Sequence, residues 1–141
     1  MKELLKDDEC IFCQIVDNKI PSQILFENDK NMAFLDIFPI SEGHTIIIPK
    51  NHYNNLEDIP ANELVELFKV VKTISNKIYE KLKVDGYNIL QNNFTAAGQV
   101  INHFHVHIIP RRIEDRKFHL MIPSEQSSLE ELKKTREKIV K

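Results

Sequence analysis

The chain has 141 residues, enough for one compact domain with a buried core and too few for two ordinary domains. Its formal net charge of -2, with 42% apolar and 28% charged residues, fits a globular protein and argues against a nucleic-acid binder. No apolar run reaches the roughly 18 residues of a membrane span, and the N-terminus is too charged for a secretion signal. We therefore expect a cytoplasmic protein that binds neither nucleic acid nor membrane.

The first part of the chain predicts one short helix and three strands. Residues 10–17 carry apolar side chains at helical spacing, and Pro21 follows them. Two extended runs, 23–27 and 32–37, are separated by a polar, turn-forming cluster, which is typical of a hairpin. A β-branched run at 44–49 ends in proline and predicts a buried third strand.

The second part predicts one long helix and two further strands. Apolar residues recur every three or four positions over 61–83, and Pro60 suits the first turn of that helix. Strands are expected at 87–91 and 102–111, and a charged helix at 128–141. Strands without intervening helices predict an α+β fold, with a five-stranded, mostly antiparallel sheet and the long helix packed on it.

The segment His103-Phe104-His105-Val106-His107 alternates imidazoles with apolar side chains, which on a strand places three histidines on one face. An exposed strand face has no stability reason to prefer imidazole, so we interpret this face as functional. Two chemistries remain open at this point. The imidazoles could ligate a metal such as zinc, or they could surround a phosphate and supply a nucleophile.

The residues upstream of this segment favour the phosphate reading. Asn92, Gly98 and Gln99 supply amide donors and a flexible backbone, while no carboxylate occurs between Asp85 and Glu114. That composition suits an anionic substrate better than a divalent metal that requires carboxylates. A neutral imidazole, with an ordinary pKa of about 6.5, is a competent nucleophile toward phosphorus at pH 7 without a metal.

The alternating segment resembles the signature of the histidine-triad (HIT) family, and the resemblance extends over about residues 10–112 of a single domain spanning 1–141, with 113–141 as a tail. The spacing is similar to that of the HINT-like branch. Further matching blocks are Cys10–Val16, Ala33–Ile37, Gly43–Lys50 and Ala97–Gln99.

The resemblance implies a hydrolase or transferase that acts on purine nucleotide conjugates, either nucleoside phosphoramidates or dinucleoside polyphosphates. His105 would be the nucleophile and form a covalent nucleotidyl-histidine, flanked by His103 and His107. His107 and His44 would bind the phosphate oxygens and assist the leaving group. No catalytic cofactor is implied, and the family's members form two-fold homodimers with a continuous sheet.

The resemblance also implies a nucleotide pocket. Asp36 matches the carboxylate that receives the ribose hydroxyls, and Asn92, Gly98 and Gln99 would line the phosphate site. The residues that match the purine enclosure are Ile11, Phe12, Ile15, Ile20, Phe34 and Ile37.

The only two cysteines, Cys10 and Cys13, form a Cys-x-x-Cys pair, which in a reducing compartment indicates a metal half-site or a redox pair. By resemblance to the family's microbial branch, His52 and His103 would complete a zinc site with them. Two thiolates and two imidazoles fill a tetrahedral set, so this zinc would be structural.

Two departures from the family pattern affect the leaving-group side of the pocket. Val100 stands where eukaryotic members carry a hydroxyl residue, and Phe94 replaces a glycine common in the preceding loop. Arg111 and Arg112 form a basic strand end that could also reach a polyphosphate.

Two alternatives to the nucleophile hypothesis stay open: a zinc-dependent hydrolase with the triad as metal ligands, and a nucleotide-binding regulatory protein with incidental activity.

Overall fold

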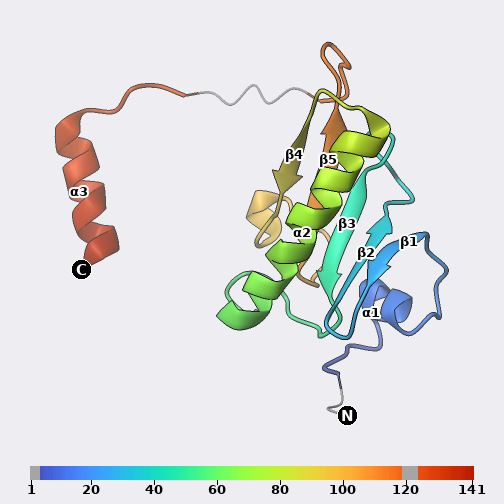
Figure 1. Cartoon of the computed structure of the whole chain (residues 1–141). Helices are drawn as coiled ribbons and strands as arrows, with labels where there is room; N and C mark the ends of the chain where they lie inside the picture. The colour runs from blue at the N-terminus through green and yellow to red at the C-terminus, as the bar shows by residue number, and fades with distance from the viewer. Residues whose placement is uncertain (1–3, 119–123) are drawn as a thin grey trace.

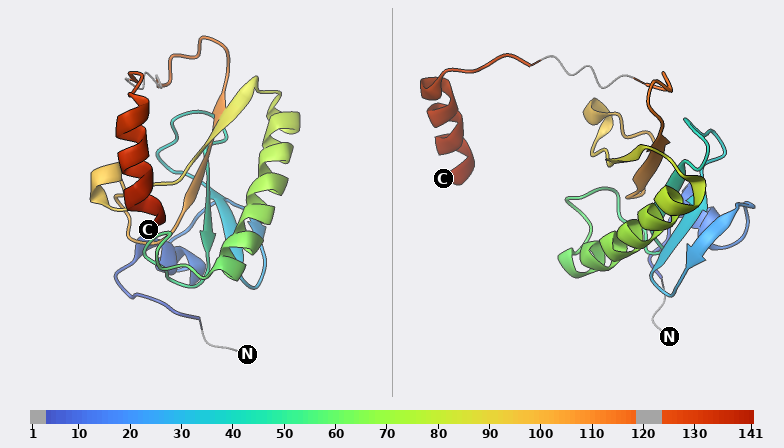
Figure 2. Two further views of the ribbon diagram at one scale, coloured as in Figure 1. Left: turned by 90° about the vertical axis from the view of Figure 1, so that its left-hand side faces the viewer. Right: turned by 45° about the horizontal axis from the view of Figure 1, so that its top comes forward.

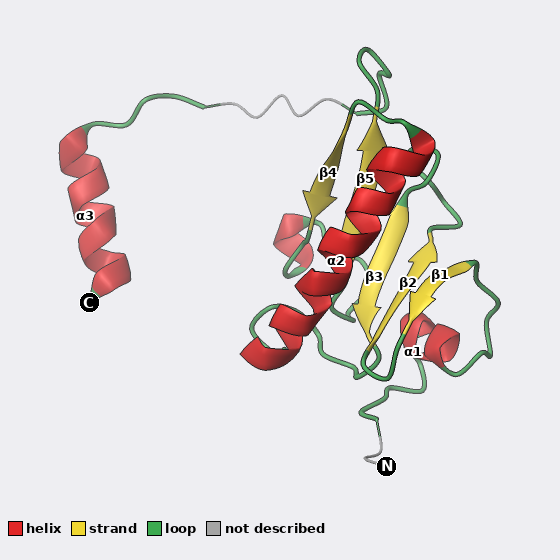
Figure 3. Cartoon of the chain, in the orientation of Figure 1, coloured by secondary structure: helices red, strands yellow, loops and turns green. Residues whose placement is uncertain are grey.

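The computed structural model describes residues 4–118 and 124–141, and its core is one antiparallel sheet with a long helix on one face (Figures 1 and 3). The strand order is β1-β2-β3-β5-β4, and all four neighbouring pairs are antiparallel. The predicted α+β class and five-stranded sheet are confirmed. The elements are α1 (Ile11–Val16), β1 (Ile24–Glu27), β2 (Asn31–Leu35), β3 (Thr45–Pro49), α2 (Ala61–Leu82), β4 (Gly86–Leu90), the 3-10 turn η1 (Thr95–Ala97), β5 (Val106–Arg111) and α3 (Leu129–Val140).

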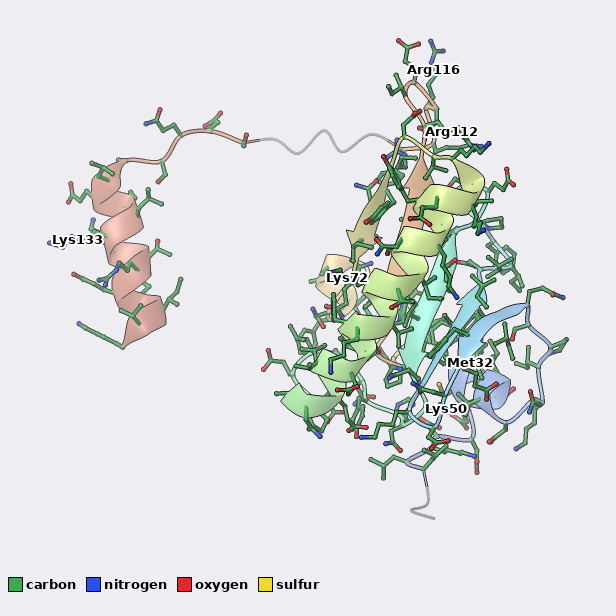
Figure 4. The ribbon with its side chains drawn as sticks, viewed as in Figure 1. Met32, Lys50, Lys72, Arg112, Arg116 and Lys133 are labelled. Carbon is green, nitrogen blue, oxygen red and sulfur yellow. The ribbon has the colours of Figure 1, made fainter. Side chains whose placement is uncertain are left out.

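Alternation along the central strands divides the core into two layers. In β3, Ile47 faces α2, whereas Ile46 and Ile48 face α1, as expected for a side-chain period of two. In β2, Met32 joins the α1 layer, where its side chain is fully buried (Figure 4). Figure 2 shows α2 on one side of the sheet and α1 on the other. The α1 layer is the one that carries the site described below.

The long helix α2 follows its sequence pattern closely. Its apolar stripe buries Leu67, Val71 and Ile74 against the sheet, and Pro60 precedes its first turn. The helix ends one residue earlier than predicted, because Lys83 adopts a left-handed conformation with φ of 52°.

The histidine segment differs from its prediction at one end. Ladder pairing in β5 begins at Val106 rather than near residue 102, because the Phe104 amide donates to the Tyr53 carbonyl, outside the sheet. The backbone nevertheless keeps its alternation before the ladder starts. Phe104 and Val106 enter the α2 layer, so the histidines between them face the opposite side of the sheet.

The predicted C-terminal helix is present as α3, which lies apart from the sheet in Figure 1 and in the right view of Figure 2. Every residue from 124 to 141 is exposed, and Lys133 marks this helix in Figure 4. Within residues 4–118 and 124–141, no helix has the length and apolar character needed to cross a bilayer.

Candidate functional site

A cavity of about 320 Å³ opens on the α1 side of the sheet. Its size is in the range of small-molecule sites, and its wall is mostly apolar with a few polar groups. His105 and His107 are among those polar groups. Nine of the ten residues proposed for nucleotide binding line it: Ile11, Phe12, Ile15, Ile20, Phe34, Asp36, Ile37, Asn92 and Gly98.

The cavity also includes residues that sequence reasoning did not assign to nucleotide binding. Phe38 and Val100 line the mouth and are 83% and 90% exposed, which is unusual for large apolar side chains. In the sequence, Phe38 lies two positions after Asp36 in a turn. A large apolar residue in an exposed turn is the sequence feature that could have indicated a ligand contact. The remaining additional lining residues are Pro21, Ser22, Leu35, Ile46 and Ile101.

His105 is held in one tautomer by the backbone. Its Nδ1 lies 2.7 Å from the carbonyl oxygen of His103, and since a carbonyl only accepts, Nδ1 carries the hydrogen. Nε2 therefore has a free lone pair. The ring of Phe12 packs edge-on against the imidazole at 5.2 Å. Burial lowers the pKa of His105 below its ordinary value of 6.5, which keeps the ring neutral at pH 7.

His44 and His107 form a hydrogen-bonded pair whose direction is also fixed. The Ile40 amide donates to His44 Nδ1 at 3.0 Å, so the hydrogen of the neutral ring is on Nε2. That Nε2 lies 2.9 Å from His107 Nδ1, which must accept. His107 is thereby left with its hydrogen on Nε2, as a donor. Burial lowers the pKa of His107 to about 4, and burial also lowers that of His44.

Asp36 is partly committed to its own turn. One carboxylate oxygen accepts from the Phe38 amide at 2.8 Å, and the other lies 3.5 Å from His44 Nε2. The carboxylate still lines the cavity and has lone pairs to spare, because each oxygen can accept two hydrogen bonds.

Gln99 shapes the loop after β4 but does not line the cavity. The Gln99 amide group accepts from the Phe94 amide at 2.8 Å and donates to the carbonyls of Asn54 at 2.6 Å and Ile101 at 3.1 Å. Gln99 is buried, and it is the one proposed nucleotide-binding residue that does not line the cavity. Gly98 does line it, with φ of 92°, a conformation that disfavours other residues.

Phe94 begins this loop in a strained conformation. Its φ of 69° and ψ of 158° belong to a region that is essentially restricted to glycine. Phe94, which stands where the resemblance implies a glycine, therefore carries backbone strain at the start of this loop.

The two cysteines and two histidines proposed as metal ligands converge on a point beside the cavity. One donor atom from each of Cys10, Cys13, His52 and His103 lies within 4.8 Å of the others. His103 Nδ1 is 3.3 Å from Cys10 Sγ and 3.5 Å from Cys13 Sγ, and His52 Nδ1 is 3.4 Å from Cys13 Sγ.

The orientation of both imidazoles suits a metal. His103 Nε2 donates to the Pro49 carbonyl at 2.8 Å, and His52 Nε2 lies 3.1 Å from Asn54 Oδ1. Each ring therefore turns the lone pair of Nδ1 toward the thiols, which is how outer oxygens orient histidine ligands. Two soft thiolates and two imidazoles in a compact set, buried except for the half-buried His52, fit Zn²⁺ with no coordination position left open.

The three triad histidines do not converge on one metal. His103 belongs to the cysteine cluster, His107 groups with Asp36 and His44, and His105 joins neither group of donors in the part of the chain that the structure describes. The second group suits a metal poorly, because His44 would have to give up the Nε2 hydrogen that its bond from the Ile40 amide requires.

Arg111 and Arg112, the basic pair after Pro110, do not line the cavity. Arg111 forms an ion pair with Asp115 at 2.8 Å and packs over Phe118, and Arg112 donates to two carbonyls at the end of α2. Neither arginine lines the cavity, so the basic strand end is explained by local structure.

Comparison with known proteins identifies relatives of this arrangement. The HIT domain family matches residues 17–114. An adenosine 5'-monophosphoramidase of Candida albicans is 41% identical over 138 residues, covering 92% of this chain and 88% of that protein. An adenylylsulfatase of Arabidopsis thaliana is 44% identical over 108 residues, covering 77% of this chain and 55% of that protein.

Solved structures share the fold over nearly the whole chain. A HIT family protein from Bacillus anthracis superposes with a TM-score of 0.88 at 36% identity, covering 95% of this chain and 96% of that one. A zinc-bound histidine triad family protein from Mycobacterium smegmatis superposes with a TM-score of 0.75 at 35% identity, covering 82% of this chain and 84% of that one.

Proposed function

The chain belongs to the HIT family and is a hydrolase of the HIT type, and from this premise we propose that it cleaves adenylyl conjugates through a covalent adenylyl group on His105. The observation that carries the proposal is the tautomer of His105. Its Nδ1 hydrogen is bound to the His103 carbonyl, so the lone pair of Nε2 is available at the wall of a mostly apolar cavity.

In the first step, His105 Nε2 forms a bond to the α-phosphorus, and the bond from phosphorus to the leaving group breaks with its electrons. The imidazole becomes positively charged, because Nδ1 keeps its hydrogen. The His103 carbonyl at 2.7 Å stabilises that charge as it develops. In the second step, the oxygen of a water molecule bonds to the same phosphorus, and the bond from phosphorus to Nε2 breaks with its electrons returning to the ring. The proton of the attacking water passes to solvent, so AMP is released and His105 is neutral again.

His107 would act as a hydrogen-bond donor to the leaving group. His107 Nε2 carries a hydrogen and can bind a phosphate oxygen or the departing atom. The neutral His44–His107 pair cannot replace a proton that His107 gives to the leaving group. The hydrogen bonds behind His107 run from the Ile40 amide to His44 and from His44 to His107, and a backbone amide does not release its hydrogen. A departing amine must therefore take its proton from water or already hold it.

This arrangement favours leaving groups that do not need a strong general acid. Amines that arrive protonated and stable anions such as sulfate both meet that condition, and alkoxides do not. The exposed side chain of Val100 at the mouth adds no donor. Monophosphoramidase and adenylylsulfatase activities, as named for two relatives, both fall within this class.

The adenosine part is assigned to the rest of the cavity. The Asp36 carboxylate would accept the ribose hydroxyls, and Phe12, Phe34 and Ile37 would enclose the purine, since all four residues line the cavity. Gly98 and Asn92 would face the phosphate.

We propose that Cys10, Cys13, His52 and His103 hold a structural zinc ion. The metal would supply stability to α1 and to the segment before β5, and its closed ligand set would leave no position for substrate. A hydrolase that uses the triad as metal ligands is disfavoured by the divergence of the three histidines.

We further propose a two-fold dimer paired through β4. This strand is at the edge of the sheet, and Tyr87, Ile89 and Leu90 are each about 40% exposed along it, at 38%, 41% and 38%. Ile89→Lys should shift the mass measured by light scattering from that of two chains to one. A wild-type protein that is monomeric at micromolar concentration would refute the proposal.

The covalent intermediate is tested by intact-protein mass spectrometry. Wild-type protein and His105→Ala are incubated briefly with adenosine 5'-phosphoramidate and quenched without acid, which would hydrolyse a phosphorus–nitrogen bond. An added adenylyl mass on the wild type alone supports the mechanism. Turnover without any adduct, lost at once on zinc chelation, would favour the metal-dependent alternative.

A regulatory role with incidental catalysis is separated by turnover number. Typical enzymes turn over near 10 per second, so values far below about 0.01 per second on every adenylyl conjugate tested would favour nucleotide binding as the function.

A further inference from the structure

We infer that metal at the cysteine–histidine cluster and nucleotide in the cavity bind cooperatively, with His103 and Asn54 as the positioning residues that join the two sites. This inference rests on the proposed function, because the nucleotide used to test it is the product of that reaction. It assigns the metal a role beyond holding the fold together.

The first connection runs through His103. Its ring faces Cys10 and Cys13 through Nδ1 and donates to the Pro49 carbonyl through Nε2, while its own backbone carbonyl accepts from His105 Nδ1 at 2.7 Å. The side chain that ligates the metal and the carbonyl that fixes the nucleophile therefore belong to one residue. A displacement of the His103 backbone would therefore move the metal ligand and the anchor of His105 together.

The second connection runs through Asn54. Its Oδ1 lies 3.1 Å from His52 Nε2, and its backbone carbonyl accepts from Gln99 Nε2 at 2.6 Å. Gln99 in turn accepts from the Phe94 amide and holds the strained loop that presents Gly98 to the cavity. The other histidine ligand is thus tied to the phosphate side of the pocket.

The third connection is Phe12, which lies between the two cysteines in sequence. Its ring contacts that of His103 at 5.8 Å and that of His105 at 5.2 Å, and it lines the cavity. Because Cys10 caps α1 by accepting from the Cys13 amide, a metal bound to both thiols fixes the turn of helix that carries Phe12.

All three connections start at metal ligands and end at residues that line the cavity or hold its loop. A metal that orders these side chains already accounts for part of the conformational entropy loss that nucleotide binding would otherwise require. Binding of the metal should therefore favour binding of the nucleotide, and the reverse. Couplings of this kind typically change an affinity 5- to 150-fold, and reciprocity requires the same factor in both directions.

The test measures the affinity of AMP by calorimetry on the full-length protein, once loaded with Zn²⁺ and once stripped by a chelator. We expect about tenfold weaker AMP binding without the metal. In the reverse experiment, saturating AMP should tighten Zn²⁺ binding by the same factor in a competition with a chromophoric chelator. Equal AMP affinity in both states, within twofold, would overturn the inference and leave the proposed function intact.

A purely structural metal could mimic this result by changing the fraction of folded protein. The folded fraction is therefore followed by circular dichroism, and Val71→Ala provides a control, because it destabilises the α2 layer, on the other side of the sheet from Cys10 and Cys13. The control should lower the melting temperature but keep the ratio of AMP affinities with and without Zn²⁺.

Asn54→Ala keeps all four metal ligands and so tests the inference even if the stripped protein unfolds. With one Zn²⁺ bound per chain, it should bind AMP several-fold more weakly than wild type. The matched control is Asn28→Ala, which removes hydrogen bonds of an exposed turn near β1 and should leave AMP affinity unchanged. Wild-type affinity in Asn54→Ala, together with independent binding of Zn²⁺ and AMP, refutes the inference.

A spectroscopic readout addresses the nucleophile directly. Long-range ¹H–¹⁵N spectra distinguish the two tautomers of a neutral imidazole, and His105 should show its hydrogen on Nδ1 in the zinc-loaded protein. Loss of that preference on metal removal is the expected result, and an unchanged tautomer would contradict the connection through His103. Protein that binds no AMP in either state would refute the proposed function and the inference with it.

Discussion

Two groups of histidines lie side by side in this protein and differ in what their ring nitrogens face. In the cysteine–histidine cluster, His52 and His103 turn their Nε2 atoms outward to oxygens and their Nδ1 lone pairs inward to the thiols. In the group at the cavity, His44 donates to His107, and the one free lone pair, on His105 Nε2, faces the cavity.

The partner of one ring nitrogen sets the tautomer of each imidazole: a carbonyl or amide oxygen places the hydrogen on that nitrogen, and an amide hydrogen keeps it off. What the other nitrogen faces then determines what the imidazole can do. His105 and His103 both donate to carbonyls and both keep a lone pair, yet one faces a cavity and the other faces two thiols. Four substitutions or conditions test this comparison, from the largest expected effect on turnover to the smallest.

His105→Ala should remove the nucleophile and lower kcat/KM at least about 10³-fold, because no other described imidazole presents a free lone pair to the cavity. Steady-state hydrolysis of adenosine 5'-phosphoramidate measures this loss. AMP affinity and zinc content should stay close to those of the wild type. Residual activity within about tenfold would show that the nucleophile has been assigned to the wrong group.

His44→Ala should lower kcat about 10²-fold with a smaller change in KM. The substitution leaves His107 Nδ1 without its donor and the Ile40 amide without its acceptor, so His107 no longer has a fixed tautomer. A full kinetic comparison of kcat and KM separates this effect from weaker binding. An unchanged kcat would mean that the orientation of His107 does not depend on the pair.

The pH dependence should show the burial of His105. Burial lowers its pKa below 6.5, and only the neutral ring attacks, so kcat/KM should persist below pH 6.5 and then fall by up to about tenfold per pH unit. The profile is measured with zinc content monitored, since protons also compete for the thiolates. An acid limb centred at or above pH 6.5 contradicts the assignment.

His52→Ala is the counterpart in the metal cluster and should have the smallest effect on kcat, below about tenfold. It should reduce zinc to less than one ion per chain and lower the melting temperature by at least about 5 °C, because a closed metal site contributes to folding. Metal analysis and calorimetry provide the two readouts. Full zinc occupancy in this variant would remove His52 from the ligand set.

The sequence predicted the layers of the fold well because local spacing controls them. The period of two in residues 103–108 assigned Phe104 and Val106 to one side of the sheet and the histidines to the other, and this holds even though ladder pairing starts only at Val106. The helical stripe of α2 was predicted to within one residue for the same reason. Alternation fixes the side of a strand on which a side chain lies without reference to distant residues.

The family resemblance identified eleven of the eighteen residues that line the cavity. It also included Gln99, which does not line the cavity, and the alternation of the triad by itself does not separate the histidines by role. Gln99 lies beside Gly98 in the chain, yet it turns away to the Asn54 carbonyl and braces the loop. His103 and His105 have the same residue type and the same alternation, and only their neighbours distinguish them.

Local spacing along the chain thus fixes which strand side chains lie on the α1 side of the sheet. The tautomer of each imidazole depends instead on hydrogen-bond partners that folding brings to it. The deciding partners are the Pro49 carbonyl for His103 and the Ile40 amide for His44, and the first of these is 54 residues away in the chain. A hydrogen bond depends on distance and direction in space, which spacing along a chain does not encode.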